Sequence, residues 1–348
     1  MKDPCENSAE NEPEEEVKAA AGDFSEIAEA EKGSVADSDS DFETEGTLGL
    51  GEVVKDTLYL GFCQAFNVVP VSCFLRQENA AELSLRHRGL GPQGAQALAS
   101  MLTSNPYIKR LDLRDNGLCV AGAEALADVL SKNSSISDVD LSENQFGAPG
   151  VQALCAALTV NQAVQKMKLA GNGLEEQAAK YLADLLLVHT GLKSLDLSYN
   201  QLNDQAGETL GPALAENTGL TELDISWNHL RGPGAIAFAR GLEANIFLKV
   251  LDISYNGFGD LGALAVAEAL KVNNVLEELN MSNNRIFAAG ALSLGMDLRV
   301  NQTLRILVDI EVNRKFDDLA SSVKVILPGL CIKKGAQREQ YPQGSAPK

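Results

Sequence analysis

The sequence predicts an α/β solenoid, a stack of strand–loop–helix units that share one core. Three observations predict it. Two apolar residues separated by a single residue recur eight times, without a gap, at intervals of 28 residues. An Asn stands three residues after the second apolar residue in seven of the eight units, and a pair of apolar residues four apart closes every unit. A unit this short cannot bury its own apolar face, so stacked copies must bury it together.

The first half of each unit is predicted to be a short strand, because its apolar residues alternate with residues that face outward. The apolar pairs are Leu83 and Leu85, Leu111 and Leu113, Val139 and Leu141, Met167 and Leu169, Leu195 and Leu197, Leu223 and Ile225, Leu251 and Ile253, and Leu279 and Met281.

The Asn after each strand is expected to hold a sharp turn, because a buried amide can donate and accept hydrogen bonds at once. Repeated along the array, these amides should form a buried ladder. They are Asn116, Asn144, Asn172, Asn200, Asn228, Asn256 and Asn284, and the first unit has Arg88 instead.

The second half of each unit is predicted to be a helix, since its apolar residues are four apart, as in Leu210 and Leu214. A second Asn ends each predicted helix, where Asn tolerates the left-handed conformation of a helix cap. These residues are Asn105, Asn133, Asn161, Asn217, Asn245, Asn273 and Asn301, and His189 takes the position in one unit as a variant cap.

The motif Leu-x-x-Leu-x-Leu-x-x-Asn-x-Leu, with a helix and a 28-residue period, resembles the ribonuclease-inhibitor-like class of leucine-rich repeats. The resemblance covers about two-thirds of the chain. It implies a curved, right-handed solenoid with a parallel sheet on the concave face and helices on the convex face.

Two caps and two tails are predicted around the eight repeats, which are assigned to residues 80–306. Residues 47–79 are interpreted as a helical N-terminal cap, because the terminal core of a solenoid must be shielded from water. Apolar residues at helical spacing predict a C-terminal cap over residues 307–333, and residues 334–348 are interpreted as a flexible tail.

The N-terminal residues 1–46 are strongly acidic. They carry 16 acidic and 3 basic side chains and few large apolar ones, so we predict that they are disordered. Ser34, Ser38 and Ser40 each have an acidic residue three positions later, a spacing that resembles the target of an acid-directed kinase. A tail that only keeps the protein soluble is the alternative.

Composition excludes several classes of function. The net charge of −19 argues against nucleic acid or an anionic membrane as the main partner, because phosphate contacts need cations. No apolar run is long enough to span a membrane, and the first residues lack the apolar segment of a secretion signal, so we expect a cytoplasmic protein. Neither a zinc site nor a disulfide framework is suggested, and the cysteines are interpreted as core fillers or unpaired thiols. The sequence shows no catalytic constellation and no cofactor motif.

An acidic stripe is predicted on the concave face, where the residue between the two apolar positions of each strand points outward. These residues are Ser84, Asp112, Asp140, Lys168, Asp196, Asp224, Asp252 and Asn280. We interpret Asp196, Asp224 and Asp252 as residues that attract a basic partner. The alternative is that Asp is simply common at this position.

A row of aromatic side chains is predicted beside the stripe, because Tyr199, Trp227 and Tyr255 each precede the Asn of three successive units. Exposed Tyr and Trp are typical of interfaces, and half-buried packing against a neighbouring loop is the alternative. Arg86 and Arg114 stand where later units have Ser, and we assign them to the partner-binding face as well. The face should therefore change from mixed charge to aromatic and acidic along the array.

The leading hypothesis is a non-catalytic, monomeric scaffold that binds a basic protein partner on the concave face. A regulator or activator of a small GTPase is the alternative, because Ran GTPase-activating protein combines a similar array with an acidic segment. Nuclease inhibition is a third hypothesis, since ribonuclease inhibitor shares the repeat and the acidity. Some similar proteins occur in axonemes, which adds association with cilia or flagella as a hypothesis.

Overall fold

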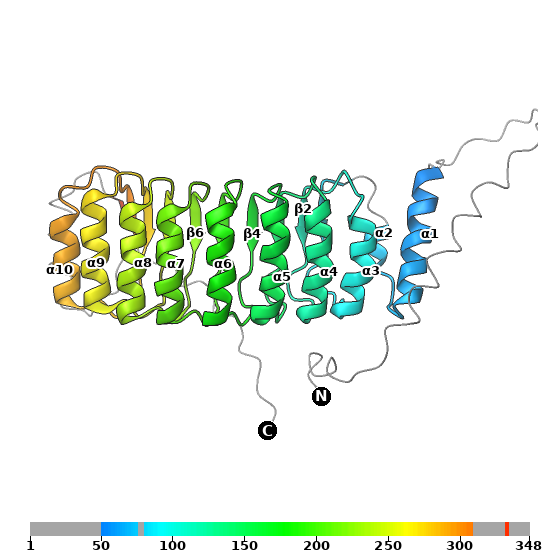
Figure 1. The fold of residues 1–348 in the computed structure, drawn as a ribbon, viewed down its shortest axis with the longest axis horizontal. Coiled ribbons are helices and arrows are strands. Elements are labelled where there is room, and N and C mark those ends of the chain that lie inside the picture. The colour runs from blue at the N-terminus through cyan, green and yellow to red at the C-terminus, as the bar shows by residue number, and fades with distance from the viewer. Residues whose placement is uncertain (1–49, 76–79, 309–330, 334–348) are drawn as a thin grey trace, which may run out of the picture. The chain divides into compact units, whose positions relative to one another are not determined.

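The repeats fold into one parallel sheet with a layer of helices packed on it (Figure 1). The computed structural model describes residues 50–75, 80–308 and 331–333. The chain divides after Thr57 into two units, and of the first unit only the start of helix α1 is described. In the second unit the α/β solenoid predicted from the 28-residue period is confirmed.

The strands are three residues long and follow one another in sequence order across the sheet, each parallel to its neighbours. In the strands between residues 82 and 308 the central residue is buried against the helices, and the register pairs each residue with the one 28 positions later, as in Leu195 and Leu223. The last described strand departs from this interval, because Cys331 pairs with Ile306. The strands are β1 (Glu82–Ser84), β2 (Arg110–Asp112), β3 (Asp138–Asp140), β4 (Lys166–Lys168), β5 (Ser194–Asp196), β6 (Glu222–Asp224), β7 (Val250–Asp252), β8 (Glu278–Asn280), β9 (Ile306–Val308) and β10 (Cys331–Lys333).

The helices α3 to α10 lie side by side in one layer, and their small and aliphatic residues complete the core (Figure 1). The helices are α1 (Leu50–Ala65), α2 (Ser72–Leu75), α3 (Gly91–Leu102), α4 (Cys119–Lys132), α5 (Gly147–Val160), α6 (Glu176–Val188), α7 (Asp204–Glu216), α8 (Gly232–Ala244), α9 (Gly259–Val272) and α10 (Ala288–Asp297). The side of the sheet that faces away from these helices is called the sheet face below.

Helices α1 and α2 lie within the segment interpreted as an N-terminal cap. The Tyr59 and Phe74 rings meet edge to face with centroids 4.6 Å apart, and the Val71 backbone N–H donates to the Tyr59 hydroxyl at 3.3 Å. Residues 1–46 and 334–348, and most of the C-terminal cap predicted over 307–333, lie outside the described residues.

The Asn residues after the strands form the buried ladder predicted from the sequence. The Asn200 side-chain amide donates to the carbonyl groups of Leu169, Leu197 and Ser198, and its Oδ1 accepts from the backbone N–H groups of Asn172 and Leu174. One side chain therefore satisfies five backbone groups of two successive repeats, which would otherwise be buried without partners.

The Asn residues after the helices also link successive repeats, but the predicted left-handed cap is wrong. Asn133, Asn161, Asn217, Asn245 and Asn273 are all extended, with φ between −121° and −67°. Each amide donates to a carbonyl group 31 residues earlier, as Asn245 does to Leu214 at 2.7 Å. The extended backbone is preferred because it aims the amide at the previous repeat.

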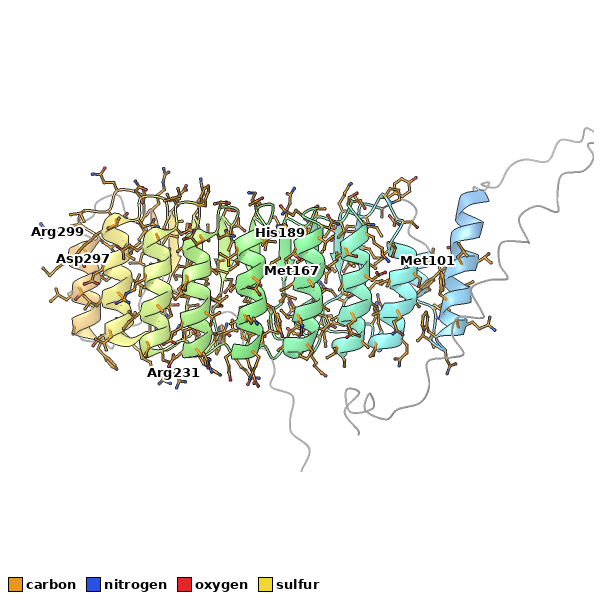
Figure 2. All side chains as sticks on the ribbon, in the orientation of Figure 1. Met101, Met167, His189, Arg231, Asp297 and Arg299 are labelled. Carbon is orange, nitrogen blue, oxygen red and sulfur yellow. The ribbon has the colours of Figure 1, made fainter. Side chains whose placement is uncertain are left out.

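His189 interrupts this second ladder. It follows the last residue of helix α6, and Figure 2 shows it at the edge of the array where the helices end. Arg231, which precedes helix α8, lies at the opposite edge, where the helices begin. Its Nδ1 accepts from the Leu192 backbone N–H at 3.0 Å, which leaves the proton of the neutral ring on Nε2. Nε2 is buried and has no hydrogen-bond partner among the described residues. Burial lowers the pKa of His189 below its usual value of 6.5.

Helices α7 and α8 approach each other backbone to backbone. A Cβ atom added at Gly207 would lie 2.6 Å from the Gly234 carbonyl oxygen, and one added at Gly211 or Gly241 would collide with the backbone of the facing helix. These two helices therefore need glycine at the contact, because any side chain would push them apart.

The cysteine predictions hold only in part. Cys63 and Cys155 are free and buried, as core fillers should be, and burial raises the pKa of Cys155 to about 12. Cys119, in contrast, is disulfide-bonded, so its interpretation as an unpaired thiol is wrong.

Replacing Asn200 with Ala should destabilise the array by about 3 kcal/mol or more, because it leaves several buried backbone groups without partners. Urea unfolding followed by circular dichroism measures the loss. Asn203→Ala is the matched control three residues later, since Asn203 caps helix α7 through the Ala206 N–H at 3.2 Å and donates to the Glu176 carboxylate at 2.8 Å, but bonds to no buried backbone group of the ladder. We expect that control to cost about 1 kcal/mol. Equal losses in the two variants would contradict the role of the ladder.

His189→Asn should restore the interrupted ladder and raise stability by about 1 kcal/mol at pH 7.5. The wild-type protein should also lose stability as the pH falls below 6.5, because the unfolded imidazole then takes up a proton that the buried ring resists. The variant should lack this part of the acid sensitivity. Unfolding midpoints at pH 7.5 and 5.5 test both points, and a variant with the wild-type pH dependence would contradict the assignment.

Candidate functional site

The side chains on the sheet face are aimed by a left-handed residue in every repeat. The residue just before the ladder position has a φ between 52° and 66° in all eight repeats. These residues are His87, Asp115, Glu143, Gly171, Tyr199, Trp227, Tyr255 and Asn283. Their backbone N–H groups continue the sheet, as Trp227 does by donating to the Ser254 carbonyl at 3.0 Å. The left-handed turn thus holds each of these residues in register with the same position of the next repeat.

Three of these residues form a stacked aromatic row, defined as Tyr199, Trp227 and Tyr255. The Tyr199 and Trp227 rings are 5.1 Å apart between centroids with an angle of 11° between their planes. The Trp227 and Tyr255 rings are 3.8 Å apart at 10°. Tyr199 and Trp227 remain 38% and 42% exposed. Because the rings lie against one another, the row presents mainly ring edges to solvent.

Three carboxylates on the same strands form a carboxylate row, defined as Asp196, Asp224 and Asp252. They are paired in register across β5, β6 and β7. Each uses one oxygen, Oδ1, to accept the backbone N–H of the Ser two residues later, at 2.9 to 3.0 Å. These bonds fix the orientation of the carboxylates and leave Oδ2 of each as a second acceptor.

Asn280 ends the carboxylate row. Its Nδ2 donates to Oδ2 of Asp252 at 2.8 Å. Among the described residues, Oδ2 of Asp196 and Oδ2 of Asp224 receive no hydrogen bond from the protein and pair with no Lys or Arg. Two neighbouring acceptors are therefore open to a partner molecule.

Burial and neighbouring negative charge raise the pKa of Asp224 from 3.8 to about 6. Burial is the main cause, followed by the charges of Asp252 and Asp196 on either side. The hydrogen bonds from Ser226 offset part of the rise. At neutral pH the row thus holds a carboxylate that is ionised against the preference of its surroundings.

The N-terminal half of the face neutralises its own charge, so the acidic residues predicted there as part of a stripe carry little unbalanced charge. Arg86 binds Asp112 and lies 3.7 Å from Asp140, and Lys168 lies 3.8 Å from Asp140. Arg114 binds Glu143. Asp112 and Asp140 are buried beneath these cations. The change from mixed charge to acidic and aromatic along the face is present.

The structure separates the sequence-predicted site residues into two groups. The first group lies together on repeats five to seven and consists of Tyr199, Trp227, Tyr255, Asp196, Asp224 and Asp252. Arg86 and Arg114 lie on the first two repeats and are engaged in ion pairs. Sequence reasoning placed Asn280 in the stripe without its bond to Asp252, and it missed that the serines fix the carboxylates, although the regular Asp-x-Ser spacing was a usable signal. Ser34, Ser38 and Ser40 lie outside the described residues.

No cluster of three or more His, Cys, Asp or Glu side chains with the geometry of a metal site occurs in residues 50–75, 80–308 and 331–333. None of the helices in these ranges is long and apolar enough to cross a membrane.

Comparison with known proteins agrees with the repeat architecture. A family model described as Leucine Rich repeat matches residues 104–127, 132–155, 189–211, 216–239, 244–267 and 272–295. Leucine-rich repeat-containing protein 74B of Homo sapiens is 69% identical over 111 residues, which is 32% of this chain and 28% of that protein. The protein of the same name from Mus musculus is 65% identical over 110 residues, with the same two shares. The match therefore spans less than a third of these relatives.

Among solved structures, an internalin C2 from Listeria monocytogenes is 19% identical, with a TM-score of 0.43. The alignment covers 74% of this chain and 92% of that chain. The family model and the curated relatives agree that the chain carries leucine-rich repeats, and about a third of its length is closely similar to leucine-rich repeat-containing protein 74B.

Proposed function

We propose that the protein is a non-catalytic scaffold that binds a basic protein partner on the sheet face of repeats five to seven. The observation that carries the proposal is the stacked aromatic row beside a carboxylate row that no Lys or Arg of the described residues neutralises. Charge complementarity selects the partner, because a basic surface would relieve the repulsion among three neighbouring carboxylates. The aromatic row supplies rigid contact area at a small cost in side-chain entropy.

The conformation of the aromatic residues supports a binding role over a structural one. Tyr199, Trp227 and Tyr255 have φ values of 55°, 54° and 53°, a region that costs a bulky residue about 1 kcal/mol or more. Gly171 and Asn283 occupy the same position in the adjoining repeats at a lower cost. Strain kept on three successive repeats, at half-exposed side chains, is typical of functional surfaces.

The charge of Asp224 supports the same reading. A carboxylate whose pKa is raised by burial and by its neighbours weakens the fold at neutral pH when it ionises. Keeping such a group on an exposed face favours a role in binding. The alternative hypothesis of a GTPase regulator rests on resemblance alone, and no contact among the described residues adds to it.

The double substitution Tyr199→Ala and Trp227→Ala should leave folding intact and weaken capture of the native partner at least about tenfold, because both substitutions remove central contact area. Pull-down from native tissue with quantitative mass spectrometry measures the loss. Tyr107→Ala is the matched control, since Tyr107 is 50% exposed and lies in the loop before β2, outside the row. Unchanged capture by the double variant, or equal loss in the control, would remove the aromatic row from the proposal.

Asp224→Asn should raise stability at pH 7.5 by on the order of 2 kcal/mol and at the same time weaken partner binding. The gain follows because the Asp224 side chain ionises near pH 3.8 in the unfolded protein but only near pH 6 in the folded protein. The wild-type free energy of unfolding therefore falls as the pH rises from about 3.8 to about 6, and the uncharged Asn avoids this loss. The gain should shrink towards pH 4. Thermal unfolding across this range and a binding assay test the two effects, and a variant that binds normally would contradict the role of Asp224.

A further inference from the structure

The occupant of the carboxylate row can be specified further, on the basis of the proposed function. Oδ2 of Asp196 and Oδ2 of Asp224 are neighbouring acceptors on adjacent strands, and strands in a sheet are about 4.8 Å apart. Oδ1 of each is already held by Ser198 or Ser226, so the two carboxylates are fixed before a ligand arrives. A ligand that donates to both must present two N–H groups in one rigid unit.

A guanidinium group has this geometry. Its N–H donors form a planar fork that can serve two acceptors at once, whereas a lysine ammonium is a compact and strongly hydrated charge. Its apolar stem could also lie along the aromatic row, which presents ring edges and no acceptor groups of its own apart from the tyrosine hydroxyls. We propose that this surface binds an arginine side chain of the partner, with its guanidinium bridging Asp196 and Asp224 next to Trp227.

The charged groups around Asp224 make this binding depend on pH. Asp196 on β5 and Asp252 on β7 flank it, and Glu222 lies on the same face of its own strand, β6. All of these are acidic. In the free protein, burial and then the charges of Asp252 and Asp196 favour a proton on Asp224, whose pKa is about 6. A bound guanidinium favours the ionised form instead. Arginine binding therefore releases the proton from Asp224, and the affinity falls as the pH drops below about 6.

The only Trp of the chain is Trp227, so selectively excited tryptophan fluorescence reports on this site alone. We expect a blocked Gly-Arg-Gly-Arg-Gly peptide to quench or shift this emission and to bind at least about tenfold more tightly than its Gly-Lys-Gly-Lys-Gly counterpart. With a pKa of about 6, the arginine peptide should bind about fourfold more weakly at pH 5.5 than at pH 7.5. Asp224→Asn should bind the peptide weakly and with the same affinity at both pH values.

A matched control changes the net charge equally on the opposite side of the same repeats. Glu208, Glu243 and Glu268 are exposed on helices α7, α8 and α9, and their joint replacement by Gln removes as much charge as Asp196→Asn, Asp224→Asn and Asp252→Asn together. The helix variant should retain arginine-peptide binding and its pH dependence. Equal loss in both triple variants would show a general charge effect and overturn the inference.

Further outcomes separate this inference from the proposed function. Equal affinity for the arginine and lysine peptides, or a wild-type pH dependence in Asp224→Asn, would overturn the arginine site even if the triple Asp variant no longer captures the native partner. Unchanged partner capture by that triple variant would instead overturn the proposed function itself.

Proton release, measured by calorimetry in buffers of different ionisation enthalpy, should reach about half a proton per peptide at pH 6, and no release would overturn the coupling.

Discussion

The buried amide of the ladder Asn is the constraint on which the rest of the structure depends. Each of these side chains satisfies backbone groups of two successive repeats, and so permits a strand of only three residues to end in a sharp turn. That turn places the preceding residue in the left-handed region in every repeat. The core therefore decides where the exposed side chains stand, and a ladder buried beneath the sheet produces a surface on which side chains recur in register.

Much of the fold and of the site could be predicted because the period of 28 residues carries the register with it. Once Leu195, Leu223 and Leu251 are aligned, Tyr199, Trp227 and Tyr255 must lie side by side, and the structure shows them stacked. The charge state of the face could not be predicted in the same way. Whether an Asp is open or neutralised depends on how far a flexible side chain reaches, as Arg86 reaches Asp112 in the next repeat. The conformation of the helix-ending Asn residues could not be predicted either, because Asn is suited both to a left-handed cap and to an extended residue that bonds to the neighbouring repeat.

Stability and recognition oppose each other on repeats five to seven. The aromatic residues occupy a backbone region that suits Gly or Asn better, and Asp224 ionises between two other carboxylates. The regular bonding beneath them, from Asn200, Asn228 and Asn256, offsets these costs. The first repeats follow the opposite course, because their acidic residues are paired with Arg86, Arg114 and Lys168 and offer little unbalanced charge to a partner.

The glycine contacts between helices α7 and α8 bear on the mechanics of this surface. Solenoids flex when neighbouring helices slide or separate, and here two backbones already touch through Gly207, Gly211 and Gly241, with no side chains between them to rearrange. We therefore expect bending of the solenoid to be concentrated in other repeats and the repeats around Trp227 to stay comparatively rigid. A partner that lands there meets a rigid template and forfeits little configurational freedom in the receptor.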